Sequence, residues 1–271
     1  SGARPEGRAT YFSTKTVEAC LSTNQSEMFE GAFSRVIREY DMESLPHLGT
    51  FYMKQPRKEG RQYFIAGDPG TGAAPARNAP CLICFDVTDA PGAVQVVGFW
   101  WGNGGNSIMP FVTRMVEWIE HWHPIFVGVD NTGPQKSTAE LISTEYIYGK
   151  NMSVQSVTGL DFSGAKRYSY LVALRLTLES MMMTWPHILT GIGTQLKNYD
   201  PILDKLTGKL AQDIVATMAM GAYAIRAYYG VFSQEDGDQD GRDDATITES
   251  RRSSRDEIRR RGRDLLRARL A

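Results

Sequence analysis

Three aspartates, each beside a strongly apolar segment, are the residues of this chain whose type and placement could do chemistry. Asp68 ends the run YFIAGD, Asp130 ends IFVGVD, and Asp213 opens DIVATMAMGAYAI. Singly, each has an ordinary structural explanation, because aspartate favours turns and the first turn of a helix. Together they supply the carboxylate oxygens that Mg²⁺ prefers. Two such ions about 4 Å apart can activate a water and stabilise the leaving oxygen in phosphodiester hydrolysis.

The turn after the first of these segments, GDPGTG, is rich in glycine. Such a turn often cradles phosphate, but a carboxylate within it repels phosphate unless a cation lies between them. GDPGTG lacks the lysine of the ATP-binding loop G-x-x-x-x-G-K-[ST], and TGPQKST has the wrong spacing for that loop. The sequence therefore predicts a metal site beside the turn and no ATPase motor in this chain.

Two of the three aspartates follow segments that are typical of buried strands. Residues 62–67 and 125–130 are continuous apolar runs, as expected for strands covered on both faces of a sheet. In open α/β sheets, ligands gather where the carboxyl ends of neighbouring strands meet. If these two strands are neighbours, Asp68 and Asp130 project from the same edge of the sheet.

The remaining periodicities predict how strands and helices alternate. Ala90-Pro91-Gly92 is a turn signal between two β-rich runs and predicts a hairpin. Three strands followed by alternating helices and strands predict an α/β fold, with a mixed sheet covered by helices on both faces. Residues 41–60 are expected to be a charged connector, and residues 184–210, which contain proline and glycine, to be irregular. Helices are expected at 26–40, 106–122, 137–149, 166–183 and 211–230, and a further strand at 152–159.

Composition excludes two classes of protein. No apolar run is long enough to span a membrane, and three cysteines do not make a disulfide framework. Cys81 and Cys84 lie in one predicted strand, where alternation puts their thiols on opposite faces. The net charge of −1 conceals an uneven distribution, since residues 235–249 are acidic and residues 251–271 are rich in arginine. The basic end could contact DNA phosphates or dock on a partner protein.

Four segments, taken in order, resemble the nuclease domain of large terminase subunits, the motors that cut and package the DNA of tailed phages. They are GDPGTG, VGVDNTG, FSGAKRYSYLVALRLTLES and KLAQDIVATMAMGAYA. The resemblance covers about residues 60–230, and YFSTKTVEACLS resembles the segment that joins the family's ATPase and nuclease domains. It implies a ribonuclease H-like α/β fold with strand order 3-2-1-4-5 and helices on both faces of the sheet.

The resemblance also implies the site. Asp68, Asp130 and Asp213 would be the metal-binding catalytic acids, holding two Mg²⁺ or Mn²⁺ ions, and the chain would be an endodeoxyribonuclease. Lys166 and the adjacent Arg167 would approach the DNA backbone.

The chain departs from the family pattern at two places. Gln212 precedes Asp213 where the family commonly has two consecutive acids, and no acid follows Asp68 closely in its turn. Asp86, at the end of the second strand, could compensate for the missing acid.

The resemblance further implies partners and a domain organisation. Residues 1–60 would link to an ATPase domain, residues 61–230 would form the nuclease, and residues 231–271 would be an acidic linker and basic tail. Expected partners are concatemeric double-stranded DNA, the portal and the small terminase subunit, in the cytoplasm of the host cell and without a membrane. A resolvase or transposase of the same fold, an actin-like ATPase and a non-catalytic docking module stay open as alternatives.

Overall fold

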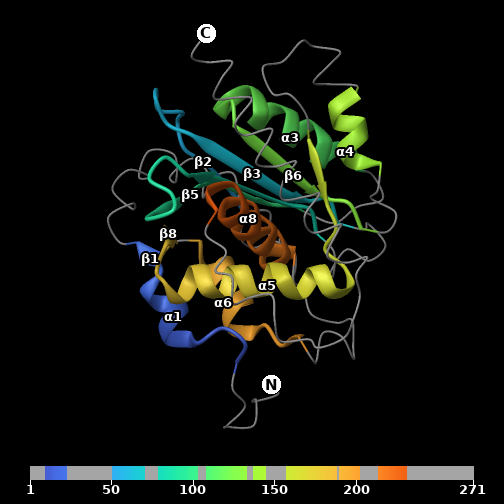
Figure 1. The fold of residues 1–271 in the computed structure, drawn as a ribbon. Coiled ribbons are helices and arrows are strands. Elements are labelled where there is room, and N and C mark those ends of the chain that lie inside the picture. The colour runs from blue at the N-terminus through green and yellow to red at the C-terminus, as the bar shows by residue number, and fades with distance from the viewer. Residues whose placement is uncertain are drawn as a thin grey trace, which may run out of the picture.

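A mixed sheet runs through the middle of the molecule (Figure 1). This computed structural model describes residues 10–22, 51–70, 79–102, 108–132, 137–144, 157–187, 189–201 and 213–230. Its strands are β1 (Leu21–Ser22), β2 (Phe51–Lys54), β3 (Tyr63–Asp68), β4 (Cys81–Asp86), β5 (Val94–Trp101), β6 (Phe126–Asp130), β7 (Thr158–Leu160) and β8 (Met183–Pro186). They pair in the order β1-β8-β5-β4-β3-β6-β7, and β2 pairs with β5 outside this path.

The strand β3 lies inside the sheet, between β4 and β6. It pairs antiparallel with β4 and parallel with β6, so the two strands that end in Asp68 and Asp130 are neighbours. The strands β4 and β5 form the expected antiparallel hairpin. Counted along the chain, the run β5-β4-β3-β6-β7 has the order 3-2-1-4-5.

Helices cover both faces of the sheet, as predicted (Figure 1). The helices α3 and α4 lie on one face, and α8 lies against the other, with α5, α6 and α1 beyond it. Their bounds are α1 (Thr14–Ala19), α3 (Met109–Trp122), α4 (Thr138–Leu141), α5 (Gly164–Glu179), α6 (Thr190–Asn198) and α8 (Asp213–Tyr229). No helix among the described residues is both long enough and apolar enough to cross a membrane.

The sheet separates two hydrophobic cores because successive strand side chains point to opposite faces. Phe64 and Ala66 pack in the core on the α8 side, whereas Ile65 packs in the core on the α3 side. Cys81 and Cys84 follow the same rule, which confirms their predicted separation, and both are free and buried. Side chains at the end of β3 therefore face α8 or α3 according to their position in this alternation.

Some of the expected elements are wrong. Residues 184–210 are not irregular throughout, because β8 forms across Met183–Pro186 and α6 across Thr190–Asn198. The strand β8 pairs in parallel with both β1 and β5, and Trp185 is fully buried. Within the expected connector 41–60, β2 pairs with β5. The helix 26–40 and the tail 231–271 lie outside the described residues.

Candidate active site

Asp68 and Asp130 are the last residues of two adjacent parallel strands. Gly67 of β3 is in register with Val129 of β6, so the two aspartates follow side by side. Val129 belongs to the core on the α3 side, and a Cβ on Gly67 would clash with Phe111 of α3. Because strand side chains alternate, Asp68 and Asp130 both face α8.

Asp213 joins them from the helix that packs on that face. It is the first residue of α8, and one of its carboxylate oxygens, Oδ2, accepts a hydrogen bond of 3.1 Å from the backbone N–H of Ala79, just before β4. The exposed fractions of Asp68, Asp130 and Asp213 are only 9%, 8% and 3%. The structure thus brings the three predicted acids to one end of the sheet and buries each from solvent.

Burial dominates the electrostatics of this site, and the charges of the other two acids add to it at Asp68. Burial, followed by the charges of Asp213 and then Asp130, raises the pKa of Asp68 well above its usual range. Burial also raises the pKa of Asp213 to about 7, although the N–H of Ala79 and the side chain of Trp101 favour its charged form. Among the described residues, none of the three acids forms an ion pair with lysine or arginine.

Asp130 is held by Thr132, two residues further along the chain. Its Oδ1 accepts from the backbone N–H and from the hydroxyl of Thr132, the first at 3.0 Å. Burial still raises its pKa, but these hydrogen bonds oppose the rise. The Thr132 hydroxyl also accepts from the N–H of Phe162 at 2.9 Å, which joins the end of β6 to the segment after β7.

The three residues fit a hard divalent cation in donor type, because carboxylate oxygens are the ligands that Mg²⁺ prefers. Within the described part of the chain, no three His, Cys, Asp or Glu side chains converge to enclose one ion. Mg²⁺ is commonly bound by one or two carboxylates, with water and substrate phosphate completing its shell. A bound cation stabilises the charged form of carboxylates that otherwise repel one another. Cys81 of β4 is in register with Asp68 of β3. It is a poor metal ligand because burial keeps the pKa of its thiol well above the usual range.

Lys166 lies near the start of α5. Its Nζ is 3.6 Å from Asp161 Oδ2, and both side chains are substantially exposed. The next residue, Arg167, donates to the Tyr199 hydroxyl at 3.1 Å. The guanidinium of Arg167 also lies 5.5 Å from the centre of the Phe162 ring.

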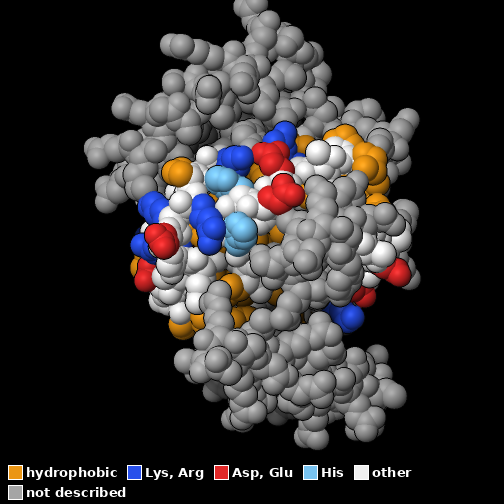
Figure 2. All heavy atoms as spheres, turned by 90° about the horizontal axis from the view of Figure 1, so that it is seen from above, with side chains coloured by type: hydrophobic (Ala, Val, Ile, Leu, Met, Phe, Trp, Pro, Cys, Tyr) orange, Lys and Arg blue, Asp and Glu red, His pale blue; other side chains and the backbone are white. Residues whose placement is uncertain are grey.

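The opposite, α3-covered side of the molecule has a mixed charge. Figure 2 looks onto this side and shows acidic, basic and histidine side chains next to one another. Glu117 of α3 pairs with both Lys54 of β2 and Arg114, at 2.9 and 2.7 Å. Because acids neutralise the cations there, the described part of this face offers no uniformly basic surface for DNA.

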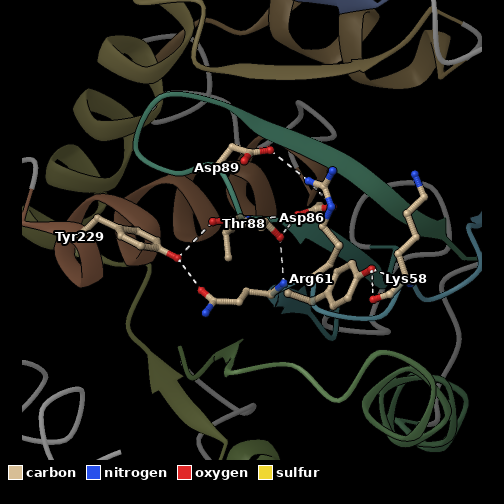
Figure 3. A network of polar contacts seen from close by, with 9 residues as sticks. Lys58, Arg61, Asp86, Thr88, Asp89 and Tyr229 are labelled. Atoms are coloured by element: carbon tan, nitrogen blue, oxygen red, sulfur yellow. Dashed lines mark hydrogen bonds and ion pairs between the residues drawn. The ribbon is translucent and has the colours of Figure 1, made fainter. Parts of the chain in front are cut away.

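The suggestion that Asp86 compensates for a missing acid is wrong. In the antiparallel β3–β4 pair, Asp86 is in register with Tyr63, at the opposite end of β3 from Asp68. The two ends of β3 are five residue steps apart, about 17 Å. Figure 3 shows that Asp86 belongs to a different polar network, in which it accepts from Thr88 and lies 3.5 Å from Arg61.

Sequence reasoning missed residues that support the acids. The Asp-x-Thr spacing of Asp130 and Thr132 was a usable signal, because a threonine two residues after an aspartate often closes a local turn. Gln195 of α6 accepts a hydrogen bond from the backbone N–H of Ile214, but it lies in a segment expected to be irregular and gave no signal. Gln212 lies outside the described residues.

Solved structures of similar fold are nuclease domains of phage terminases. The large terminase nuclease from thermophilic phage G20c with bound magnesium has a TM-score of 0.50 and 15% identity, over 79% of this chain and 96% of that chain. The same nuclease with bound zinc has a TM-score of 0.48 and 19% identity, over 65% and 86%. The large terminase from the thermophilic bacteriophage D6E has a TM-score of 0.45 and 14% identity, over 67% and 42%.

No protein-family model and no curated protein matches the sequence. The comparison with the magnesium-bound nuclease therefore bears on the fold of the chain. It confirms the expected α/β fold class, a mixed sheet with helices on both faces. The chain is similar in fold to the nuclease domains of phage large terminases, the resemblance that its four sequence segments indicated.

Proposed function

We propose that this chain is a metal-dependent endonuclease that cuts concatemeric viral double-stranded DNA during genome packaging. One observation carries the proposal. Asp68 and Asp130 end adjacent parallel strands on the face where Asp213 opens α8. All three carboxylates are buried, and none forms an ion pair with lysine or arginine among the described residues. The similar fold of a terminase nuclease crystallised with magnesium supports it.

The three acids have distinct roles in this proposal. Asp68 and Asp130 share one Mg²⁺ or Mn²⁺ ion, and Asp213 helps to hold a second. When bound, such a pair of ions supplies an activated water and stabilises charge on the leaving oxygen. Asp68 is oriented by the N–H of Gly70 at 2.9 Å, and Asp130 is oriented by Thr132.

The surroundings of the acids complete the proposal. Lys166 and Arg167 contact the DNA backbone beside the acids, where cations compensate phosphate charge. Residues 61–230 form the nuclease unit, with residues 1–60 leading from an ATPase domain and residues 231–271 forming a linker and basic tail. The portal and the small terminase subunit are the proposed partners, in the host cytoplasm.

Cleavage of supercoiled plasmid tests the proposal. The chain is incubated with Mg²⁺, Mn²⁺ or EDTA, as wild type and as Asp68→Asn. The matched control is Asp86→Asn, which changes the same residue type at the other end of the same strand pair. Metal-dependent nicking that is lost in Asp68→Asn and retained in Asp86→Asn is expected. Equal loss in both variants, or cutting that persists in EDTA, would contradict the assignment of the site.

A further inference from the structure

The start of α8 needs an external partner because the first N–H groups of a helix have no acceptor within it. Ile214, directly after Asp213, donates its backbone N–H to the side-chain oxygen Oε1 of Gln195 at 3.1 Å. Gln195 is 19 residues away in sequence and belongs to another helix, α6. The hydrogen bond therefore fixes where α8 begins relative to the rest of the fold.

The helix α6 is a firm support for this contact. Its side chains Ile192 and Leu196 are fully buried in the core on the α8 side. A Cβ on Gly191 would lie 3.5 Å from Cδ1 of Ile214, which shows how closely α6 approaches the first turn of α8. On its other side, Lys197 pairs with Glu18 of α1 at 2.7 Å. Gln195 thus holds α8 from a packed helix rather than from a loose segment.

Gln195 is expected to lower the stability of the fold at this position. Its amide nitrogen Nε2 is buried and has no hydrogen-bond partner among the described residues. Burying an unpaired donor carries a free-energy cost. Residues that lower stability are expected mainly at functional sites, and the nearest such site is the carboxylate of Asp213.

We propose that Gln195 is a positioning residue for Asp213. The Asp213 carboxylate is held by the N–H of Ala79 on one side, and its backbone is held by Gln195 through Ile214 on the other. Gln195 contacts neither metal nor DNA in this role. It sets the position of α8, and hence the distance of Asp213 from Asp68. This inference rests on the proposed metal-dependent nuclease.

The test compares two variants, of which only one keeps an acceptor for the N–H of Ile214. Gln195→Leu keeps the approximate size of the side chain but removes the acceptor for Ile214. Gln195→Glu retains a side-chain oxygen at that place and removes the unpaired donor. Mn²⁺ binding to the DNA-free protein is measured by calorimetry, and the half-maximal Mn²⁺ concentration for plasmid cleavage is measured in parallel.

We expect Gln195→Leu to weaken Mn²⁺ binding by about 10- to 100-fold, as for other residues that orient a metal ligand. Cleavage at saturating Mn²⁺ should change much less, and Gln195→Glu should restore binding to near the wild-type value. If Gln195→Leu lowers thermal stability but binds Mn²⁺ like wild type, Gln195 is only structural and the inference is overturned. If the leucine variant does not fold, Gln195→Asn, which is too short to reach Ile214, replaces it.

Failure of the two proposals can be told apart. A wild-type chain that neither binds Mn²⁺ nor cuts DNA overturns the nuclease proposal, and the role of Gln195 with it. A wild-type chain that cuts DNA with metal, beside Gln195 variants whose Mn²⁺ affinity is unchanged, overturns the role of Gln195 alone.

Discussion

Two strand-end aspartates, Asp68 and Asp86, show at the residue scale how surroundings decide what a carboxylate does. Asp86 accepts two hydrogen bonds from Thr88 and lies 3.5 Å from Arg61. Asp68 faces two other acids, whose charges add to burial in raising its pKa. Asp86 and Asp68 are similarly buried, but the partners of Asp86 stabilise its charge, whereas the neighbours of Asp68 repel it.

Asp68→Asn should therefore stabilise the metal-free protein while removing its activity. Relief of repulsion among buried carboxylates of about 1 kcal/mol corresponds to a rise of about 2–4 °C in Tm for a chain of this size. Loss of a metal ligand that contributes about 3 kcal/mol to the transition state lowers cleavage about 100-fold. Calorimetry in EDTA and plasmid cleavage measure the two effects. A lower Tm for Asp68→Asn in EDTA would show that the acids do not repel one another.

Thr132→Val tests the support of Asp130. Valine has nearly the shape of threonine but cannot donate to the carboxylate or accept from the N–H of Phe162. We expect Mn²⁺ affinity to fall about 10- to 100-fold and stability to fall by about 1–3 kcal/mol. Thr132→Ser keeps the hydroxyl and is the control, expected to bind Mn²⁺ within a few-fold of wild type. Equal affinities for the valine and serine variants would exclude the hydroxyl from the site.

At the scale of elements, the position of α8 depends on close contact with the sheet. A Cβ on Gly221 would lie 2.5 Å from the Phe85 ring of β4, far inside normal contact. Gly221→Ala should therefore destabilise the fold by roughly 1–3 kcal/mol through overpacking, despite the better helix propensity of alanine. Because α8 carries Asp213, cleavage should also fall. Gly193→Ala in α6 is the matched control.

The Gly193→Ala control has a defined expectation of its own. Its added Cβ would meet only Val17 Cγ1 at 3.9 Å, an ordinary contact. Alanine favours a helix over glycine by about 1 kcal/mol, so this variant should be as stable as wild type or more so. Thermal unfolding of both variants decides the matter. A Gly221→Ala protein as stable as Gly193→Ala would mean that α8 can move away from β4 at no cost.

The sequence predicts best the elements that carry their own pattern. The strands around Ile65 and Val127 are continuous apolar runs, and the helix after Asp213 is apolar throughout, so local composition sufficed. The strand β8 and the helix α6 were not predicted, because Trp185 and Leu196 are buried by partners far away in sequence. The same limit applies to the site. Its acids were predicted from their positions, whereas the contact of Gln195 with Ile214 exists only once α6 and α8 have packed.

At the scale of the whole molecule, the buried acids make stability depend on pH when metal is absent. The pKa of Asp213 is raised to about 7 in the fold, against about 3.9 in an unfolded chain. Between these values the folded state binds more protons than the unfolded state, so stability is greatest at the acidic end of this window. It falls as pH rises from about 4 through 7 and then levels off.

Thermal unfolding in EDTA across this pH range measures the effect. The loss should exceed about 1.4 kcal/mol, and Asp213→Asn should reduce the slope. Mn²⁺ added above pH 7 should raise the Tm, because it binds only the folded protein. A Tm that rises with pH in EDTA, equally in wild type and Asp213→Asn, would contradict the assigned shift.

The two ends of the β3–β4 pair hold their carboxylates in different ways, and Figure 3 shows the end that carries Asp86. Asp86 has a permanent counter-ion, Arg61, built into the chain, and this network also includes Asp89. Asp68 has no such partner among the described residues, and under the proposed function it takes its counter-ion from solution. Chelation of the metal should therefore abolish DNA cleavage without unfolding the protein, and added metal should restore cleavage within the time of mixing. The metal-free protein is then expected to be folded and inactive.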